Sequence, residues 1–405
     1  MQCKETVVVT DKAARSLRNG HPWIYEAEVL ELRDVPDDGG LVQVQSKAGK
    51  WLGVGFYNSN SKIRVRILTR NPNDTIDRSF WIRRLNYAVA YRRVVMGDDF
   101  SNCRLIFGEA DGFPGLTVDR FGPVLVAQIL CLGIEYIKED ILGSLVSILR
   151  ESGEQIEAVY ERNDVKLREK EGMEQGKGFL ELPGLKTDLD GHVEIIENGV
   201  HYDVDYINGQ KTGFFLDQKY NRAAIARLAK GKRVLDCFTH TGAFGLNCAL
   251  AEAEQVVSVD VSELALEQAK HNAELTGVQN VKYVQRDVFD LLTELADGKR
   301  GQYDLVILDP PAFTKSSATV SSAIRGYKEI NLKAMRILPR GGYLATCSCS
   351  HFMTDERFRA MLADAAKDAQ VQLRQIEARQ QGPDHPILWN VPETDYLKFY
   401  IFQIV

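Results

Sequence analysis

The sequence predicts an α/β protein that ends in a doubly wound parallel sheet. Short apolar runs recur between helical stretches in the C-terminal half, and most of these runs lead into polar or reactive residues. A tight turn at Gly242 joins the first run to a helical pattern, as in the strand-to-helix turns that form ligand crevices in such sheets. Ahead of this domain, short strand-like runs with polar turns predict a small N-terminal β-barrel and a central α+β module.

The composition is that of a soluble globular chain of two or three domains. The 405 residues are 44% hydrophobic and 26% charged, which is ordinary for such chains. No apolar run is long enough to span a bilayer, and the first residues lack a signal-peptide core. Seven cysteines, an odd count without paired metal spacing, favour reduced thiols in the cytoplasm over disulfides or a metal site.

Positive charge is concentrated at the front of the chain. Residues 1–104 carry a net charge of +5, whereas residues 105–405 carry −11. A locally positive surface attracts polyanions even when the whole chain is acidic. The alternative is a chance imbalance on solvated faces. The charge distribution is therefore compatible with a nucleic-acid partner that contacts the N-terminal segment.

The predicted domains are residues 1–73, residues 74–197 and residues 198–405. In the first, a short helix over 11–18 places Arg15 and Arg18 outward. The run from Lys62 alternates polar and apolar residues, so that Lys62, Arg64 and Arg66 share one strand face. These five basic residues are the candidate RNA contacts. A long helical stretch over 74–96 opens the central domain, in which no catalytic pattern stands out.

Acids follow the predicted strands of the C-terminal domain. Asp236 ends the first run ahead of the glycine turn, and an acid there suits a ligand with an amine-bearing tail, such as S-adenosylmethionine. Asp260 ends the second run about twenty residues later, where α/β folds hold ribose hydroxyls. Asp287 and Asp309 follow the third and fourth runs. Because the chain lacks G-x-G-x-x-G, a nicotinamide dehydrogenase is disfavoured.

These ordered motifs resemble those of class I S-adenosylmethionine-dependent methyltransferases. The segment 208–222, Asn-Gly-Gln-Lys-Thr-Gly-Phe-Phe-Leu-Asp-Gln-Lys-Tyr-Asn-Arg, and the Ser-Cys-Ser around Cys349 are more particular. They resemble the bacterial 23S ribosomal RNA large subunit methyltransferase I family. The resemblance covers the whole chain, and residues 1–73 resemble a PUA domain, a small RNA-binding β-barrel. It implies a cytosine-5 methyltransferase that uses S-adenosylmethionine and acts on large-subunit ribosomal RNA.

The resemblance also implies functional residues. Cys349 is expected to be the nucleophile and Asp309 to bind the target base. Cofactor contacts are expected from Gln210, Thr212, Phe214, Gln218, Asp236, Phe238, Thr239, Thr241, Gly242, Asp260, Val261, Asp287, Val288 and Asp309. Cys347 competes with Cys349 for the nucleophilic role, but its place nearer the strand body favours an inert buried thiol.

Several alternatives stay open on the sequence. One is a guanine methyltransferase on the same scaffold, acting at N7 or N2, which needs no thiol. Another is a non-catalytic RNA-binding protein that retains the fold. Related RNA cytosine-5 enzymes carry a second cysteine after the motif proline, where this chain has Ala312, so the group that removes the carbon-5 proton is unassigned. The modified nucleotide and the oligomeric state, for which a homodimer is one alternative, are also undetermined.

Overall fold

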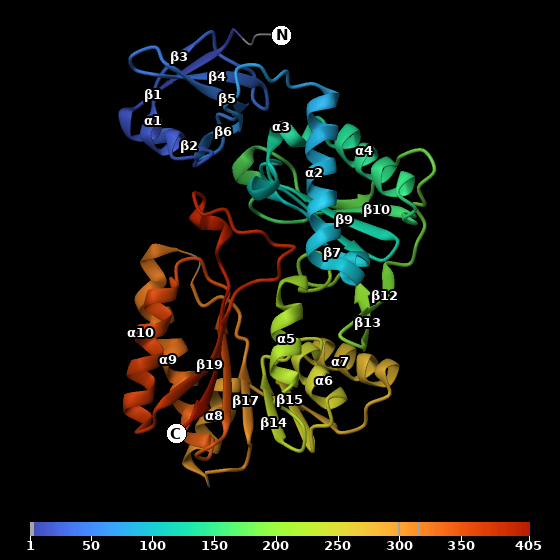
Figure 1. Ribbon diagram of the computed structural model, residues 1–405, viewed down its shortest axis with the longest axis vertical. Helices are drawn as coiled ribbons and strands as arrows, with labels where there is room; N and C mark the ends of the chain where they lie inside the picture. Colours follow the sequence, from blue (N-terminus) through green and yellow to red (C-terminus); the bar gives the residue numbers. More distant parts are fainter. Residues whose placement is uncertain (1–3, 299, 315) are drawn as a thin grey trace. The chain divides into compact units, whose positions relative to one another are not determined.

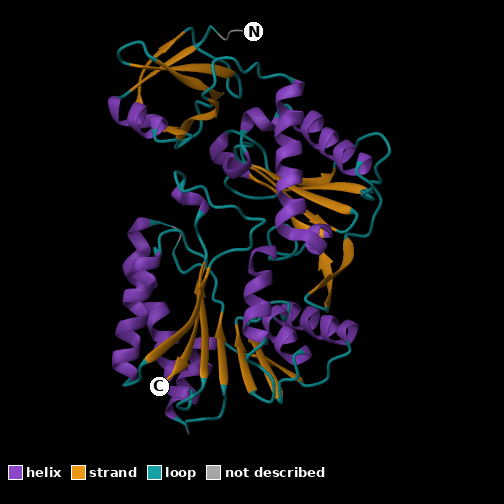
Figure 2. Ribbon diagram, viewed as in Figure 1, coloured by secondary structure: helices purple, strands orange, loops and turns teal. Residues whose placement is uncertain are grey.

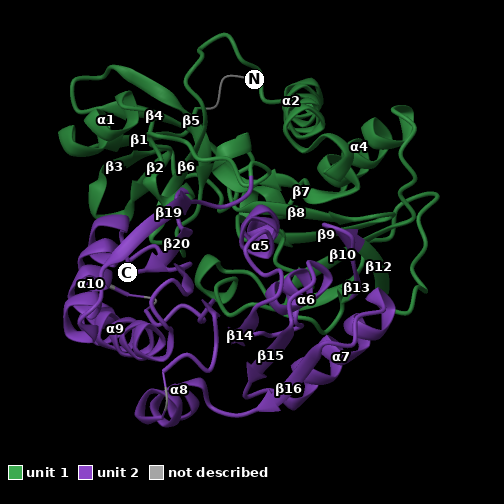
Figure 3. Ribbon diagram, turned by 60° about the horizontal axis from the view of Figure 1, so that its bottom comes forward, with its two compact units in different colours: residues 1–195, 204–216, 383–394 green, residues 196–203, 217–382, 395–405 purple. Residues whose placement is uncertain are grey.

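The computed structural model describes residues 4–298, 300–314 and 316–405. Contacts between Cα atoms divide the chain into two compact units (Figure 3). Unit 1 comprises residues 1–195, 204–216 and 383–394, and unit 2 comprises residues 196–203, 217–382 and 395–405. Both units combine helices with β-sheets (Figure 2), as the sequence predicts.

The N-terminal part of unit 1 is a small β-domain (Figure 1). Its strands lie in the order β2-β6-β5-β4-β1-β3. They are β1 (Thr6–Val9), β2 (Trp23–Tyr25), β3 (Val29–Arg33), β4 (Leu41–Ser46), β5 (Trp51–Tyr57) and β6 (Ile63–Thr69). Helix α1 (Asp11–Arg18) has the predicted bounds, because the Thr10 side chain caps its first turn and Ala13, Ala14 and Leu17 enter the core.

The rest of unit 1 is built on a second sheet, in the order β11-β10-β9-β8-β7. Its strands are β7 (Asn102–Phe107), β8 (Leu116–Phe121), β9 (Val124–Ile129), β10 (Ala158–Asn163) and β11 (Gly176–Phe179). Its helices are α2 (Arg78–Met96), α3 (Leu132–Glu135) and α4 (Lys138–Glu151). The predicted long helix starts at Arg78, later than expected, because the Asp77 side chain accepts the Phe80 N–H at 3.0 Å and caps the first turn.

A hairpin of β12 (His192–Glu197) and β13 (Val200–Asp205) follows. The predicted boundary between residues 197 and 198 falls inside this hairpin. Short 3₁₀ helices are η1 (Glu26–Glu28), η2 (Gly97–Ser101), η3 (Gly108–Asp111), η4 (Glu169–Glu171), η5 (Leu216–Gln218), η6 (Ser317–Thr319) and η7 (Pro392–Thr394).

Unit 2 contains the predicted doubly wound sheet, in the order β16-β15-β14-β17-β18-β20-β19. Its strands are β14 (Arg233–Cys237), β15 (Gln255–Asp260), β16 (Val281–Gln285), β17 (Leu305–Leu308), β18 (Tyr343–Ser348), β19 (Leu373–Arg379) and β20 (Lys398–Ile404). β14 to β18 pair in parallel, whereas β20 pairs antiparallel with both β18 and β19. The parallel strands therefore present their carboxyl ends at one edge.

Helices cover both faces of this sheet (Figure 2). They are α5 (Lys219–Ala226), α6 (Ala243–Leu250), α7 (Glu263–Thr276), α8 (Val288–Asp297), α9 (Val320–Ile337) and α10 (Asp355–Ala369). Successive strand residues alternate between two cores: Leu308 packs with α8, α9 and α10, whereas Ile307 packs with α5 and α6. Because helices bury both faces of the sheet, a ligand can reach only the ends of its strands. The polar residues that follow the parallel strands lie at the carboxyl ends, so we expect the ligand site there.

Candidate cofactor and catalytic site

The turn after β14 has an unusual backbone. Phe238 and His240 have φ angles of +60° and +49°, and Gly242 has +85°. Residues other than glycine rarely adopt positive φ angles. Where they do, the strained positions often lie at ligand-binding sites. A side chain at Gly242 would place its Cβ 3.0 Å from the Ala269 Cβ of α7. The turn thus requires glycine both for its conformation and for close packing against α7.

Asp236 lies beneath this turn and is almost fully buried. Its Oδ2 accepts the Gly245 N–H at 2.9 Å and the Thr239 hydroxyl, which ties the strand end to the start of α6. Burial raises the pKa of Asp236 to about 7. Within the described chain its Oδ1 has no hydrogen-bond partner. An unsatisfied carboxylate oxygen at the turn fits the amine end of S-adenosylmethionine.

The remaining turn residues hold the loop in place. The Phe238 ring packs edge-on against Phe289 and Phe313, with ring centroids 6.5 Å apart in both pairs. Thr239 donates its backbone N–H to Val259, and the Thr241 carbonyl accepts from the Asn272 side chain at 3.1 Å. The loop is therefore fastened to β15, α7 and α8 before any ligand binds.

Asp260 ends β15 at the next position along the edge. Its Oδ2 accepts the His240 N–H at 2.9 Å, and its Oδ1 accepts the Ser262 N–H at 3.0 Å. Each carboxylate oxygen has two lone pairs, so one remains on each for a ribose hydroxyl. Val261, the next residue, has a 61% exposed apolar side chain, which is suited to packing on an adenine ring.

Asp287 follows β16 and is exposed. Its Oδ1 accepts the Phe289 and Asp290 N–H groups at 2.7 and 3.3 Å, so that it caps α8. Val288 is buried in the core with α8, α9 and α10, so only its backbone is suited to cofactor contact. Asp287 thus has a structural role in addition to its predicted contact with the cofactor.

We expect Asp260→Ala to weaken binding of S-adenosylhomocysteine roughly ten- to hundredfold, since a charged hydrogen bond contributes about 1.5–3 kcal/mol. The variant also loses the tie to His240. Isothermal titration calorimetry measures the affinity, and Glu263→Ala on the exposed start of α7 is the matched control. Unchanged binding in Asp260→Ala would remove Asp260 from the cofactor site.

Asp309, at the end of β17, forms a cluster with Cys347 and Gln218. The Cys347 thiol donates to Asp309 Oδ1 over 2.8 Å, and the Gln218 side-chain amide donates to the same oxygen over 3.3 Å. Gln218 Nε2 also lies 3.5 Å from the Cys347 sulfur. Burial, and next the charge of Asp309, raise the pKa of Cys347 well above its usual range. Cys347 is therefore a protonated structural thiol that orients Asp309.

Cys349 lies one residue beyond the end of β18 and is half-buried. The serines on both sides of it are fixed: Ser348 donates to the Tyr327 hydroxyl at 3.0 Å, and Ser350 donates to the Thr314 carbonyl at 2.9 Å. The two cysteines differ as the sequence predicts, since Cys347 is fully buried within the strand and Cys349 is partly accessible past its end. Accessibility is required of a nucleophile.

The predicted cofactor contacts of the Asn208–Arg222 segment are divided between the two units. Gln218 belongs to unit 2 and joins the Asp309 cluster. Gln210, Thr212 and Phe214 belong to unit 1, where Gln210 is exposed and the other two are buried. The Thr212 hydroxyl donates to Asp119 at 2.6 Å. For these three residues a cofactor contact stays a prediction.

The structure corrects one residue of the predicted RNA-binding face, Arg66 on β6. Arg66 is 8% exposed, and its guanidinium lies 3.0 Å from Glu109 and 3.3 Å from Glu171. Arg64 is paired with Glu26 at 2.9 Å and donates to the Asn58 carbonyl at 3.1 Å. Glu109 and Glu171 lie outside the small β-domain in sequence, so alternation along the strand could not reveal these partners of Arg66. Arg66 is thus an internal ion-pair residue, whereas an RNA contact of Arg64 stays a prediction.

Arg15, Arg18 and Lys62 are exposed, as expected of RNA contacts. Arg15 and Arg18 are three residues apart on α1 and so lie on one helix face. Lys62 precedes β6. For these three residues an RNA contact stays a prediction.

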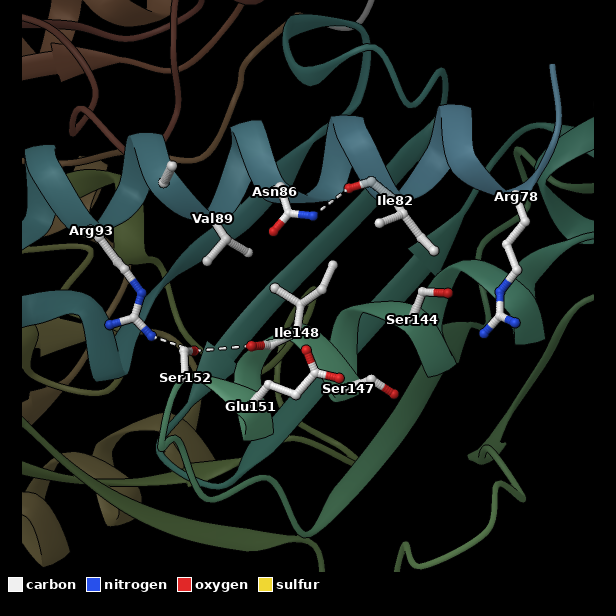
Figure 4. A pocket seen from close by; sticks show the side chains of 11 residues that line it. Arg78, Ile82, Asn86, Val89, Arg93, Ser144, Ser147, Ile148, Glu151 and Ser152 are labelled. Atoms are coloured by element: carbon white, nitrogen blue, oxygen red, sulfur yellow. Dashed lines mark hydrogen bonds between the residues drawn. The ribbon is translucent and has the colours of Figure 1, made fainter. Parts of the chain in front are cut away.

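The groove between α2 and α4 of unit 1 is a different feature (Figure 4). It has a volume of about 580 Å³ and none of the predicted site residues lines it. Its polar groups serve the helices themselves: Arg93 donates to Ser152 at 2.6 Å, and Asn86 donates to the Ile82 carbonyl at 2.9 Å. We interpret it as a packing groove.

Sequence reasoning missed Lys398 on β20 and Tyr327 on α9, which surround the Cys349 turn. Neither residue belongs to a motif with regular spacing. Over residues 4–298, 300–314 and 316–405, no group of three or more His, Cys, Asp and Glu could hold a metal ion. Among these same residues no helix is long and apolar enough to cross a membrane.

Comparison with known proteins agrees with this geometry. Residues 7–70 match the family described as PUA-like domain, and residues 185–402 match S-adenosylmethionine-dependent methyltransferase. The fold and the strand-end acids thus define an S-adenosylmethionine-dependent methyltransferase that carries a PUA-like domain. Its cofactor is S-adenosylmethionine.

The chain belongs to the ribosomal RNA large subunit methyltransferase I family. It is 42% identical over 390 residues to that protein from Aeromonas hydrophila, covering 95% of both chains. The Escherichia coli relative is 38% identical over 405 residues, covering 98% of this chain and 99% of its own.

Solved structures support the same fold. A chain from Streptococcus mutans, described as a SAM-dependent methyltransferase, superimposes with a TM-score of 0.81 at 21% identity, covering 98% of this chain and 99% of its own. A structure of SMU.776, described as a methyltransferase complexed with SAH, gives a TM-score of 0.82 at 20% identity and the same coverage.

Proposed function

We propose that this protein methylates carbon 5 of a cytosine in large-subunit ribosomal RNA, through a covalent intermediate on Cys349. The family name of its relatives supports the substrate, since they are ribosomal RNA large subunit methyltransferases. The observation that carries the choice of base is the half-buried Cys349, which follows β18 at the carboxyl edge of the sheet. The neighbouring strand, β17, leads into Asp309.

Cytosine needs a nucleophile because its carbon 5 is too electron-poor to take a methyl group unaided. The Cys349 thiolate adds to carbon 6, forming a sulfur–carbon bond and moving the double-bond electrons toward carbon 5. When bound, the cofactor supplies an electrophilic methyl group, which carbon 5 takes. Loss of the carbon-5 proton then expels the thiolate and restores the ring double bond.

Asp309 has the role of recognising the base. Its carboxylate is an acceptor, and cytosine offers the N4 amine as a donor where uracil offers an acceptor. The thiol of Cys347 and the amide of Gln218 hold Asp309 Oδ1 in place, and Pro310 restricts the backbone that follows. To reach this edge, the base must leave its stack.

A guanine methyltransferase is the competing function, because a carboxylate also accepts from guanine donors. Such an enzyme needs no thiol, so it gives Cys349 no chemical role. To test the proposal, ribosomal RNA from a deletion strain would be digested and its 5-methylcytosine mapped by mass spectrometry. We expect one 5-methylcytosine to disappear and to return with the wild-type gene. Loss of a methylguanine instead would overturn the proposal.

The PUA-like domain is expected to add electrostatic affinity for RNA. We expect Arg15→Glu with Arg18→Glu to weaken RNA binding and to reduce the slope of log Kd against log salt by about 0.7–0.9 per lost phosphate contact. Filter binding at several salt concentrations measures this slope. Arg33→Glu is the control, because Arg33 is already paired with Glu31 at 3.0 Å. If the slope does not change, α1 does not contact the RNA.

A further inference from the structure

Lys398, the first residue of β20, is buried although it carries an amine. Its Nζ donates to the Ser350 carbonyl over 2.7 Å and to the Tyr396 carbonyl over 2.8 Å. Neither partner is an acid. Among the described residues, the amine donates hydrogen bonds to neutral carbonyls alone. A buried lysine in such surroundings is costly to keep charged, which suggests that the amine has a use beyond packing.

The position of Lys398 is defined with respect to Cys349. In the antiparallel pairing of β18 with β20, Ser348 is the register partner of Lys398. The side chain of Lys398 then binds the carbonyl of Ser350. The backbone pairing with Ser348 and the hydrogen bond from Nζ to the Ser350 carbonyl bring the amine close to Cys349, and the two groups interact electrostatically.

Burial lowers the pKa of Lys398 to about 8, and this is the largest effect on it. The charged and titratable groups that act on the amine are Asp395, Cys349, Asp355 and Cys347, and all of them favour its protonated form. Cys347 is engaged with Asp309, and Asp355 accepts the Tyr400 hydroxyl. Cys349 is the thiol that remains accessible to substrate.

We propose that Lys398 is the positioning residue that exchanges a proton with Cys349 and stabilises its thiolate. An amine bound to two carbonyls can do this without breaking either bond. As a neutral amine it donates both hydrogens to the carbonyls and offers its lone pair to the Cys349 proton; as an ammonium it directs the third hydrogen to the thiolate. The sulfur loses one proton and the nitrogen gains it.

A catalytic role for the pair of Lys398 and Cys349 rests on the proposed function. The reactivity of the Cys349 thiol, however, can be measured without RNA. We would follow alkylation of Cys349 by iodoacetamide between pH 5 and 10 in a Cys347→Ser background, using mass spectrometry of the tryptic peptide. We expect the wild-type reactivity midpoint to lie below about 8.5, the ordinary cysteine value. Lys398→Met should raise the midpoint by about one pH unit or more, whereas Lys398→Arg should keep it low.

Lys230→Met is the matched control, because Lys230 is an exposed lysine of the same unit that is paired with Glu252 at 2.6 Å. It should leave the profile unchanged, and binding of S-adenosylhomocysteine checks that each variant is folded. An ordinary midpoint in the protein with native Lys398 would overturn the proposal even if Lys398→Met fails to fold. An identical profile in folded Lys398→Met would also overturn it. A shifted midpoint without any RNA adduct would instead refute the proposed function alone.

Discussion

Replacing Cys349 with serine should reduce methyl transfer to RNA by roughly four orders of magnitude or more, the scale seen when a covalent nucleophile is removed. A serine hydroxyl is too weakly acidic to add to carbon 6 without a strong base. Incorporation of a labelled methyl group into a ribosomal RNA fragment measures the rate. The affinity for S-adenosylhomocysteine should stay within about twofold of wild type, because Cys349 has no predicted cofactor contact.

Cys347→Ser is the matched control for this prediction. Cys347 is fully buried and donates its thiol proton to Asp309, a bond that a serine hydroxyl can also form. We expect it to retain most of the activity. If Cys349→Ser keeps its activity and Cys347→Ser loses it, Cys347 is the nucleophile and Cys349 is not.

Arg66→Ala should destabilise the N-terminal part of unit 1 by about 3–5 kcal/mol, because it leaves the buried Glu171 and the largely covered Glu109 without their shared partner. Glu109 and Glu171 have side chains only 13% and 8% exposed. Glu109 also accepts the Trp23 indole N–H at 2.8 Å, so the tryptophan environment should change with it. The free energy is measured from hydrogen exchange of the β6 amides in increasing urea.

Arg15→Ala provides the comparison, since an exposed arginine on α1 should alter stability by less than about 0.5 kcal/mol. The two substitutions should therefore have different effects. Replacing Arg66 should lower the stability of the domain, and replacing Arg15 should lower its affinity for RNA. If Arg66→Ala is as stable as wild type but binds RNA more weakly, the ion-pair assignment is wrong.

Much of the fold could be predicted because local sequence determines it. The parallel sheet followed from apolar runs that end in polar residues. Local side chains also fix where helices begin, as the N-caps Ser262 of α7 and Thr354 of α10 show. Asp260 and Asp309 were predicted at strand ends because each follows an apolar run. Parallel strands have their carboxyl ends at the same edge of the sheet, so both acids were expected there.

The rest depended on contacts between residues distant in sequence. Alternation put Arg64 and Arg66 on one face but could not show that Glu109 and Glu171 cover Arg66. The bond from Lys398 to Ser350 depends on the register of β18 with β20. The hydrogen bond that makes Cys347 a support for Asp309 likewise joins two strands.

The central claim is that Cys349 forms a covalent bond with cytosine, and trapping tests it most directly. In RNA that contains 5-fluorocytosine, carbon 5 carries fluorine in place of the departing proton, so the adduct cannot resolve. With S-adenosylmethionine present, wild type and Cys347→Ser should give a protein–RNA complex that survives denaturing gel electrophoresis, and Cys349→Ser should give none. A trapped complex in Cys349→Ser, or its absence in an active wild-type enzyme, would contradict the account.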